Sequence, residues 1–195
     1  MNIPSWFSSP LQSALFYGSL LLWVATELVN TLVLGRHRHG GSRKDRGSYF
    51  GVSIAINLAF VLMLLLRSRG VGLVPTLFQW VGLAMVWAGG LVREWAILNL
   101  GRAFTVVVEV TPGQSLITSG PYRWVRHPAY TGILILLGGF GLAVGSWLGA
   151  ILAMAVTLAG FSYRVRVEER AMLEAFGDDY RNYMHRTGRY LPRVL

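Results

Sequence analysis

An uncharged run of 36 residues, from residue 128 to residue 163, constrains this chain more than any other feature. As a single helix it would be about 54 Å long at 1.5 Å per residue, whereas the hydrocarbon core of a bilayer is about 30 Å thick. The run must therefore turn back on itself. We expect the turn at residues 144–147, which gives a hairpin of two short helices. Three glycines allow close backbone approach there: Gly141, Gly145 and Gly149.

Three further stretches are long and apolar enough to cross a membrane. They cover residues 11–34, which Glu27 interrupts, residues 49–66 and residues 75–98. Composition agrees with this interpretation, because only 14% of the residues are charged, compared with about 25% in ordinary soluble domains. The sequence therefore predicts an all-α, multi-pass membrane bundle of five transmembrane helices, of which the last two form the hairpin.

The basic residues predict an orientation for this bundle. None precedes the first span, five lie in the loop of residues 36–46, two lie between the second and third spans, three lie between the third span and the hairpin, and seven follow the hairpin. An N-terminus outside and a C-terminus in the cytoplasm put fifteen of them on the cytoplasmic side and two on the other, as the positive-inside rule requires. Topology in a plasma (inner) membrane thus explains the net charge of +9 without a nucleic-acid partner.

Other classes of protein and site are disfavoured by simple counts. Residues 1–26 carry no charge, so the basic start of a signal peptide is missing. The chain has no cysteine and four histidines, which excludes a disulfide and a cysteine nucleophile and predicts no metal site. No pattern in the sequence predicts an oligomeric state.

Two polar segments on the cytoplasmic side are too long to be simple connectors. Residues 99–127 contain a β-branched run and two turns, and we expect a compact loop in which Gly120 lets a ligand approach the backbone, although an ordinary turn glycine fits equally well. Residues 164–195 should continue the last span to Gly177, form a short second helix, and end in a tail folded back over the site. Residues 1–98 thus hold three spans and a basic loop, and residues 99–195 form the catalytic half.

Charged and aromatic residues gather where these segments meet the spans. His127 precedes Pro128 at an expected helix start, which suits an anionic or polar ligand group, although a capping histidine explains the same pattern. Arg164 and Glu168 lie four residues apart on one helix face, and Glu169 lies about 100° further round. These charges either hold a ligand or form a solvated, salt-bridged helix surface.

Three ionisable residues lie inside the predicted spans: Glu27, Arg93 and Glu94. Glu94 is near the end of its span and can reach the interface, whereas Glu27 should face the bundle interior or pair with a basic group. We interpret all three as structural rather than catalytic.

Residues 116–132, with the sequence LITSGPYRWVRHPAYTG, and the segment that begins RVRVEE at Arg164 and continues to Pro192 resemble a known family. It is the isoprenylcysteine carboxyl methyltransferase family, together with the related phospholipid N-methyltransferases. These are integral membrane enzymes that use S-adenosylmethionine. The resemblance covers residues 99–195, whereas the N-terminal half is similar only as hydrophobic spans.

The resemblance implies a cytoplasmic cofactor pocket between the loop, the helix start at His127 and the helix that carries Glu168. The cofactor-binding residues it implies are Leu116, Ile117, Gly120, Tyr122, His127, Tyr130 and Glu169. We expect Arg164 to orient the acceptor and Glu168 to complete the polar network. The expected acceptor is lipophilic, a carboxylate of the isoprenylcysteine type, which is ionised at neutral pH and so needs no strong base.

Other functions remain open at this stage. The chain also fits a phospholipid amine N-methyltransferase, since the first three spans do not distinguish one lipophilic acceptor from another. A nicotinamide-dependent membrane reductase has a similar helical hairpin. A non-catalytic membrane protein that docks a partner through the basic loop of residues 36–46 is a third alternative.

Overall fold

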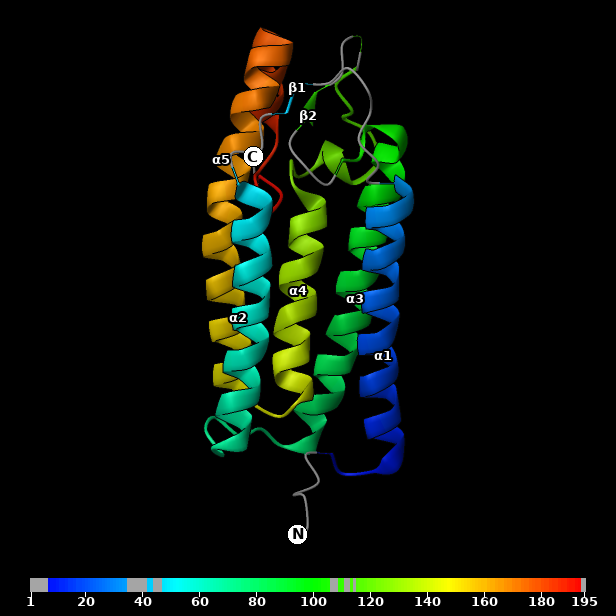
Figure 1. The fold of residues 1–195 in the computed structure, drawn as a ribbon, viewed down its shortest axis with the longest axis vertical. Coiled ribbons are helices and arrows are strands. Elements are labelled where there is room, and N and C mark those ends of the chain that lie inside the picture. Colours follow the sequence, from blue (N-terminus) through cyan, green and yellow to red (C-terminus); the bar gives the residue numbers. More distant parts are fainter. Residues whose placement is uncertain are drawn as a thin grey trace.

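The computed structural model describes residues 7–34, 42–43, 47–105, 109–110, 113 and 115–193 of the 195 in the chain. Five helices run along the length of the molecule (Figure 1). They are α1 (Pro10–Val29), α2 (Ser48–Ser68), α3 (Thr76–Leu100), α4 (Pro128–Ala143) and α5 (Trp147–Arg186). Shorter elements are the π-helix η1 (Asn30–Leu34), the 3-10 helices η2 (Gly101–Ala103) and η3 (Gly120–Arg123), and a two-residue antiparallel ladder of β1 (Ser42–Arg43) and β2 (Glu109–Val110).

The predicted helical bundle is confirmed. In the described part of the chain it departs from an all-α fold in the small ladder and in two isolated bridges, which pair Leu73 with Ser146 and Val125 with Gly188. Helices α1, α2, α3 and α5 are long and apolar enough to cross a membrane, whereas α4, with 16 residues, is shorter. Large apolar side chains point outward on these long helices, where lipid rather than water would cover them. Examples are Leu21, Phe50, Leu77, Leu91 and Ile151, all more than half exposed.

The predicted turn between the last two helices lies where the sequence placed it. Helix α4 ends at Ala143, and the Ser146 side chain caps α5 by accepting a hydrogen bond from the Gly149 N–H at 3.0 Å. This turn is tied to the connection between α2 and α3, because the Trp147 N–H donates to the Gly72 carbonyl at 2.8 Å. Both connections lie at one end of the bundle in Figure 1, opposite the polar loops.

Glycines bring α3 and α4 into backbone contact. A Cβ atom on Gly89 would lie 2.5 Å from the carbonyl oxygen of Gly132, and one on Gly139 would lie 2.7 Å from the carbonyl oxygen of Gly82. Both distances are too short for any side chain. The α3–α4 seam, defined by these four glycines, therefore depends on residues without a Cβ.

Helix α4 also forms the centre of the aromatic core. Phe140 is fully buried, and its ring centroid lies 5.5 Å from Phe16, 6.0 Å from Trp23 and 5.6 Å from Phe60. These rings come from α1, α2 and α4. Because α2 packs on α5 and α3 packs on α4, residues 1–98 and 99–195 are interleaved within one bundle.

The C-terminal segment folds back onto the start of α4. Helix α5 is kinked at Gly177, whose φ of 54° is left-handed, and continues to Arg186. The Gly188 carbonyl then accepts from the Arg126 N–H at 2.8 Å, and the Arg189 carbonyl accepts from the His127 N–H at 3.1 Å. These bonds satisfy backbone donors at a helix start that has no side-chain cap.

Part of the sequence interpretation falls on residues that the structure does not describe. Only Ser42 and Arg43 of the basic loop at residues 36–46 are described, and residues 106–108 of the β-branched run are not. The docking surface considered for that loop therefore lies outside the described residues.

Candidate functional site

A cavity of about 390 Å³ lies at the polar end of the bundle. Its walls come from α1, α2, α3, α4 and α5 and from the loop between α3 and α4. The volume falls within the range of about 300–1,000 Å³ that is typical of small-molecule sites. Seven of the predicted site residues line it: Leu116, Ile117, Tyr122, His127, Tyr130, Arg164 and Glu168.

Arg164 and Glu168 form the most tightly bonded part of the wall. Arg164 Nε donates to Glu168 Oε1 at 2.6 Å, and the Tyr130 hydroxyl donates to the same oxygen. Arg164 Nη1 donates to Ser48 Oγ, at the start of α2, at 3.1 Å. A buried charge is costly unless it is paired and hydrogen-bonded, and these contacts meet that condition. The polar cluster, defined by these four residues, is thus held rigidly by α2, α4 and α5.

His127 lies between two carboxylates. Its Nδ1 is 3.4 Å from Glu168 Oε2 and its Nε2 is 3.4 Å from Glu169 Oε1. Burial disfavours the charged imidazolium, but the two carboxylates outweigh it and raise the pKa of His127 above its ordinary value. The imidazole is therefore more readily protonated here than in water.

An aromatic stack extends from His127 into the bundle. Its ring lies parallel to that of Tyr130, with centroids 5.6 Å apart and planes 10° apart, and Tyr130 stacks in turn on Phe161 at 4.4 Å. All three side chains line the cavity. They give it a flat aromatic face next to the charged cluster, which suits a ligand with both a ring system and charged groups.

Glu169 does not line the cavity. Its carboxylate accepts from Arg126 Nε at 3.0 Å and from Arg189 Nη2 at 2.6 Å. As helix geometry requires, it lies on a different side of α5 from Glu168. The structure therefore places Glu169 behind His127, where it ties the C-terminal tail to the site.

Gly120 also lies outside the cavity lining. Its φ of 57° is left-handed, and a Cβ atom there would lie 2.4 Å from the Asn99 side chain. Asn99 thus fills the space that a side chain at position 120 would occupy. Nearby, Tyr122 does line the cavity, and burial raises the pKa of its phenol far above the usual range, which keeps it protonated.

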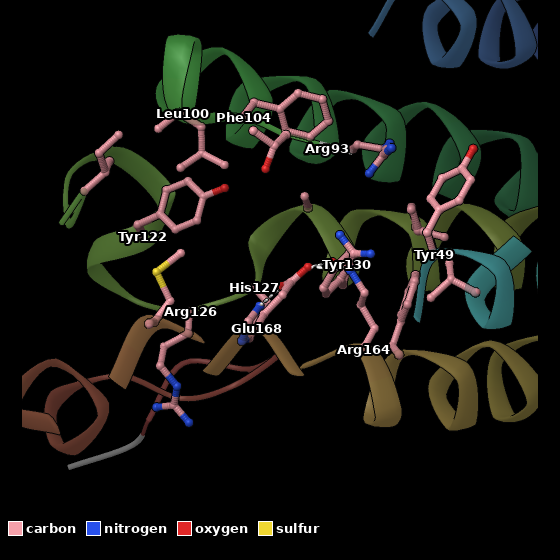
Figure 2. A pocket seen from close by; sticks show the side chains of 18 of the residues that line it. Tyr49, Arg93, Leu100, Phe104, Tyr122, Arg126, His127, Tyr130, Arg164 and Glu168 are labelled. Carbon is pink, nitrogen blue, oxygen red and sulfur yellow. Dashed lines mark hydrogen bonds and ion pairs between the residues drawn. The ribbon is translucent and has the colours of Figure 1, made fainter. Parts of the chain in front are cut away.

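Several lining residues were not predicted as site residues. Arg126 precedes His127 and points toward the C-terminal segment in Figure 2, with its Nη1 donating to the Met184 carbonyl at 3.0 Å. Glu27 and Arg93 also line the cavity, and Arg93 Nη2 donates to Glu27 Oε2 at 2.7 Å. The expected pairing of Glu27 with a basic group is confirmed, and the signal that could have placed both at the site was their charge within a span.

Comparison with known proteins identifies relatives of the whole bundle. The family model described as the isoprenylcysteine carboxyl methyltransferase (ICMT) family matches residues 80–174. Protein-S-isoprenylcysteine O-methyltransferase A of Arabidopsis thaliana is 30% identical over 183 residues, which cover 90% of this chain and 90% of that protein. A probable protein-S-isoprenylcysteine O-methyltransferase of Oryza sativa subsp. indica is 34% identical over 118 residues, which cover 60% of this chain and only 62% of that protein.

A solved structure has the same fold. It is that of the eukaryotic intramembrane Ras methyltransferase ICMT (isoprenylcysteine carboxyl methyltransferase), with a TM-score of 0.66 and 22% sequence identity. The similarity covers 97% of this chain and 70% of that one. The fold is thus shared over nearly the entire chain.

Proposed function

The chain belongs to the isoprenylcysteine carboxyl methyltransferase family, and from that premise we propose that it is a multi-pass membrane methyltransferase. Its methyl donor is S-adenosylmethionine and its acceptor is the carboxylate of a lipophilic molecule of the isoprenylcysteine type. The observation that carries the proposal is the cluster of Arg164, Glu168 and Tyr130 on the wall of a cavity enclosed by apolar helices.

The cavity lining fits the donor chemically. S-adenosylmethionine supplies an electrophilic methyl group on a positively charged sulfonium. Leu116, Ile117 and the rings of Tyr130 and His127 offer an apolar and aromatic surface for its adenine, and the carboxylate of Glu168 offers a partner for its cationic groups. Glu169, behind His127, would act on the cofactor through that imidazole rather than by direct contact.

The residues at the reacting end have positioning tasks. A carboxylate acceptor is already ionised at neutral pH, so the chain need not supply a general base. Arg164 orients the acceptor carboxylate, and Glu168 and Ser48 hold Arg164 in place. Alignment of the two substrates, and shielding of the reacting groups from water once both are bound, are what the protein would contribute.

The membrane gives the two substrates separate routes. We place the N-terminus outside and the cavity at the cytoplasmic face of a plasma (inner) membrane, with five crossings that include the shorter α4; the uneven distribution of basic residues supports this. The cofactor then enters from the cytoplasm, while a lipophilic acceptor arrives through the bilayer between the helices.

The charges of the cavity favour an acid over an amine as acceptor. Three arginines, Arg93, Arg126 and Arg164, line it against two carboxylates, Glu27 and Glu168. The lining therefore carries a net positive charge, which favours an acceptor carboxylate over a phospholipid amine that is protonated at neutral pH. This observation makes the carboxylate the preferred acceptor of this site and phospholipid N-methylation the alternative.

An acceptor panel tests the proposal. The purified protein in lipid nanodiscs is incubated with S-adenosylmethionine labelled in the methyl group and with N-acetyl-S-farnesylcysteine, its carboxamide, or phosphatidylethanolamine. We expect base-labile methyl ester from the acid alone. Label in the phospholipid would assign the activity to N-methylation instead. If no acceptor receives label, the proposed methyltransferase function is overturned.

A further inference from the structure

A second ion pair faces the polar cluster across the cavity. Glu27 of α1 and Arg93 of α3 both line the cavity, and Arg93 binds the Glu27 carboxylate side-on through both Nε and Nη2. Figure 2 shows Arg93 on α3, on the opposite wall from Arg164 and Glu168 of α5. An ion pair within membrane-spanning helices is expensive to bury and marks a candidate functional position.

The three cavity arginines differ in how they are held. Arg164 donates to Glu168, Tyr130 and Ser48, and Arg126 donates to Glu169 and to backbone carbonyls. Arg93 instead presents two parallel donors to one carboxylate, an arrangement that any carboxylate can adopt with arginine. A second carboxylate can therefore replace the partner of Arg93 more directly than it can replace the partners of Arg126 or Arg164.

The two members of the pair differ in exposure. The Glu27 side chain is 29% exposed, whereas that of Arg93 is 10% exposed. Glu27 lies three residues before the π-helix Asn30–Leu34, and such distortions of a helix occur frequently at functional sites. Arg93 is thus the buried member and Glu27 the accessible one.

Arg93 also lies between the cavity and the lipid side of the bundle. A smaller hollow of about 110 Å³ between α1 and α3 shares Trp23 and Arg93 with the main cavity. Most of its lining is apolar and includes Leu22, Trp87 and Leu91, all of them exposed on the outside of the bundle. A lipophilic acid that enters from this side meets Arg93, which faces Arg164 across the main cavity.

We propose that Glu27 is an internal substitute for the acceptor: its carboxylate occupies Arg93 until the acceptor carboxylate replaces it. This inference rests on the proposed function. Methylation turns the acceptor into an uncharged ester, which no longer competes with Glu27 for Arg93. Glu27 then returns to Arg93, so the pair admits the acid and favours release of the ester.

Binding of acid and ester to variants of the full chain in nanodiscs tests this. The ligands are N-acetyl-S-farnesylcysteine and its methyl ester. We expect Arg93→Gln to raise the Kd of the acid about tenfold or more, as loss of a charged hydrogen bond would, and to leave that of the ester unchanged. Glu27→Gln should lower the Kd of the acid several-fold, because it removes the competitor.

Two further variants separate this role from a structural one. Asp178→Asn is the matched control, because Asp178 pairs with Arg181 on the exposed surface and lines neither the main cavity nor the smaller hollow. It should leave both Kd values unchanged. The double variant Glu27→Gln/Arg93→Gln leaves no unpaired carboxylate behind and should bind the acid as weakly as Arg93→Gln.

The inference is overturned if Arg93→Gln weakens the binding of acid and ester equally. It is also overturned if Glu27→Gln does not tighten the binding of the acid. The proposed function is judged separately, on the wild-type protein. If the wild type binds S-adenosylmethionine and methylates the acid while Arg93→Gln treats acid and ester alike, only the role of Glu27 and Arg93 fails. If the wild type does neither, the proposed function fails as well.

Discussion

Arg164 and Glu168 lie one helical turn apart on α5 and are joined by a 2.6 Å hydrogen bond from Nε to Oε1. The same carboxylate oxygen accepts the Tyr130 hydroxyl, and the other oxygen of Glu168 lies 3.4 Å from His127 Nδ1. Glu168 therefore connects the guanidinium proposed to orient the acceptor with the imidazole and phenol proposed to contact the cofactor. A change at any of these residues should affect catalysis.

Replacing Arg164 by lysine should reduce kcat/KM for the acid acceptor by about 100-fold, because lysine keeps the charge but cannot donate to Glu168 and Ser48 in the same fixed geometry. Steady-state kinetics with labelled cofactor measure this. Arg181→Lys is the matched control, since Arg181 lies further along α5 and pairs with Asp178 on the exposed surface. Equal losses in the two variants would contradict a specific role for Arg164.

His127 should make stability depend on pH. Because its folded-state pKa is raised, its contribution is complete below the unfolded value of about 6.5 and is lost as the pH rises through the folded-state pKa. The difference in Tm between the wild type and His127→Gln, measured in detergent from about pH 5.5 upward, should therefore be largest at the acidic end. A difference that grows as the pH rises would rule out this effect of Glu168 and Glu169 on His127.

The α3–α4 seam should be intolerant of even one methyl group. Gly89→Ala places a Cβ atom 2.5 Å from the Gly132 carbonyl oxygen, so the backbones must separate at a cost of about 1–3 kcal/mol. Thermal unfolding measures the loss as a lower Tm. Gly51→Ala is the control, because nothing lies within 4 Å of that position on α2, and it should unfold at the wild-type temperature or slightly above. Unchanged stability in Gly89→Ala would contradict the packing of the seam.

Removing the Tyr130 hydroxyl should have a smaller effect than changing Arg164. Tyr130→Phe keeps the stack with His127 and Phe161 but removes the hydrogen bond to Glu168. A charged hydrogen bond contributes about 1.5–3 kcal/mol to the stability of the folded state, so we expect Tm to fall. We expect kcat/KM to fall only about tenfold, because Arg164 and Glu168 remain paired. Unchanged kinetics would show that Glu168 does not depend on Tyr130.

Much of the fold could be predicted because membrane thickness limits helix length. An uncharged run of 36 residues has to turn, and the turn lies at the predicted residues around Gly145. The α3–α4 seam could not be predicted in the same way. Gly82 and Gly89 are seven residues apart, as are Gly132 and Gly139, but spacing alone does not say which helix each pair contacts.

The site was predictable where its residues are neighbours in sequence. Helical spacing places Arg164 beside Glu168, and their contact was expected from the sequence. The pairing of Glu27 with Arg93, 66 residues apart, depends on how α1 and α3 pack. The direction of Glu169 is likewise set by packing, since α4 and the C-terminal tail decide which face of α5 the cavity borders.

Calorimetric titration of S-adenosylmethionine into the purified protein tests the central claim most directly. We predict saturable binding with one site per chain, and binding about tenfold weaker in Glu168→Gln, which removes the negative charge that faces the cavity. A wild-type protein that is folded by its thermal unfolding profile but gives no saturable heat would contradict the assignment of this cavity as the cofactor site.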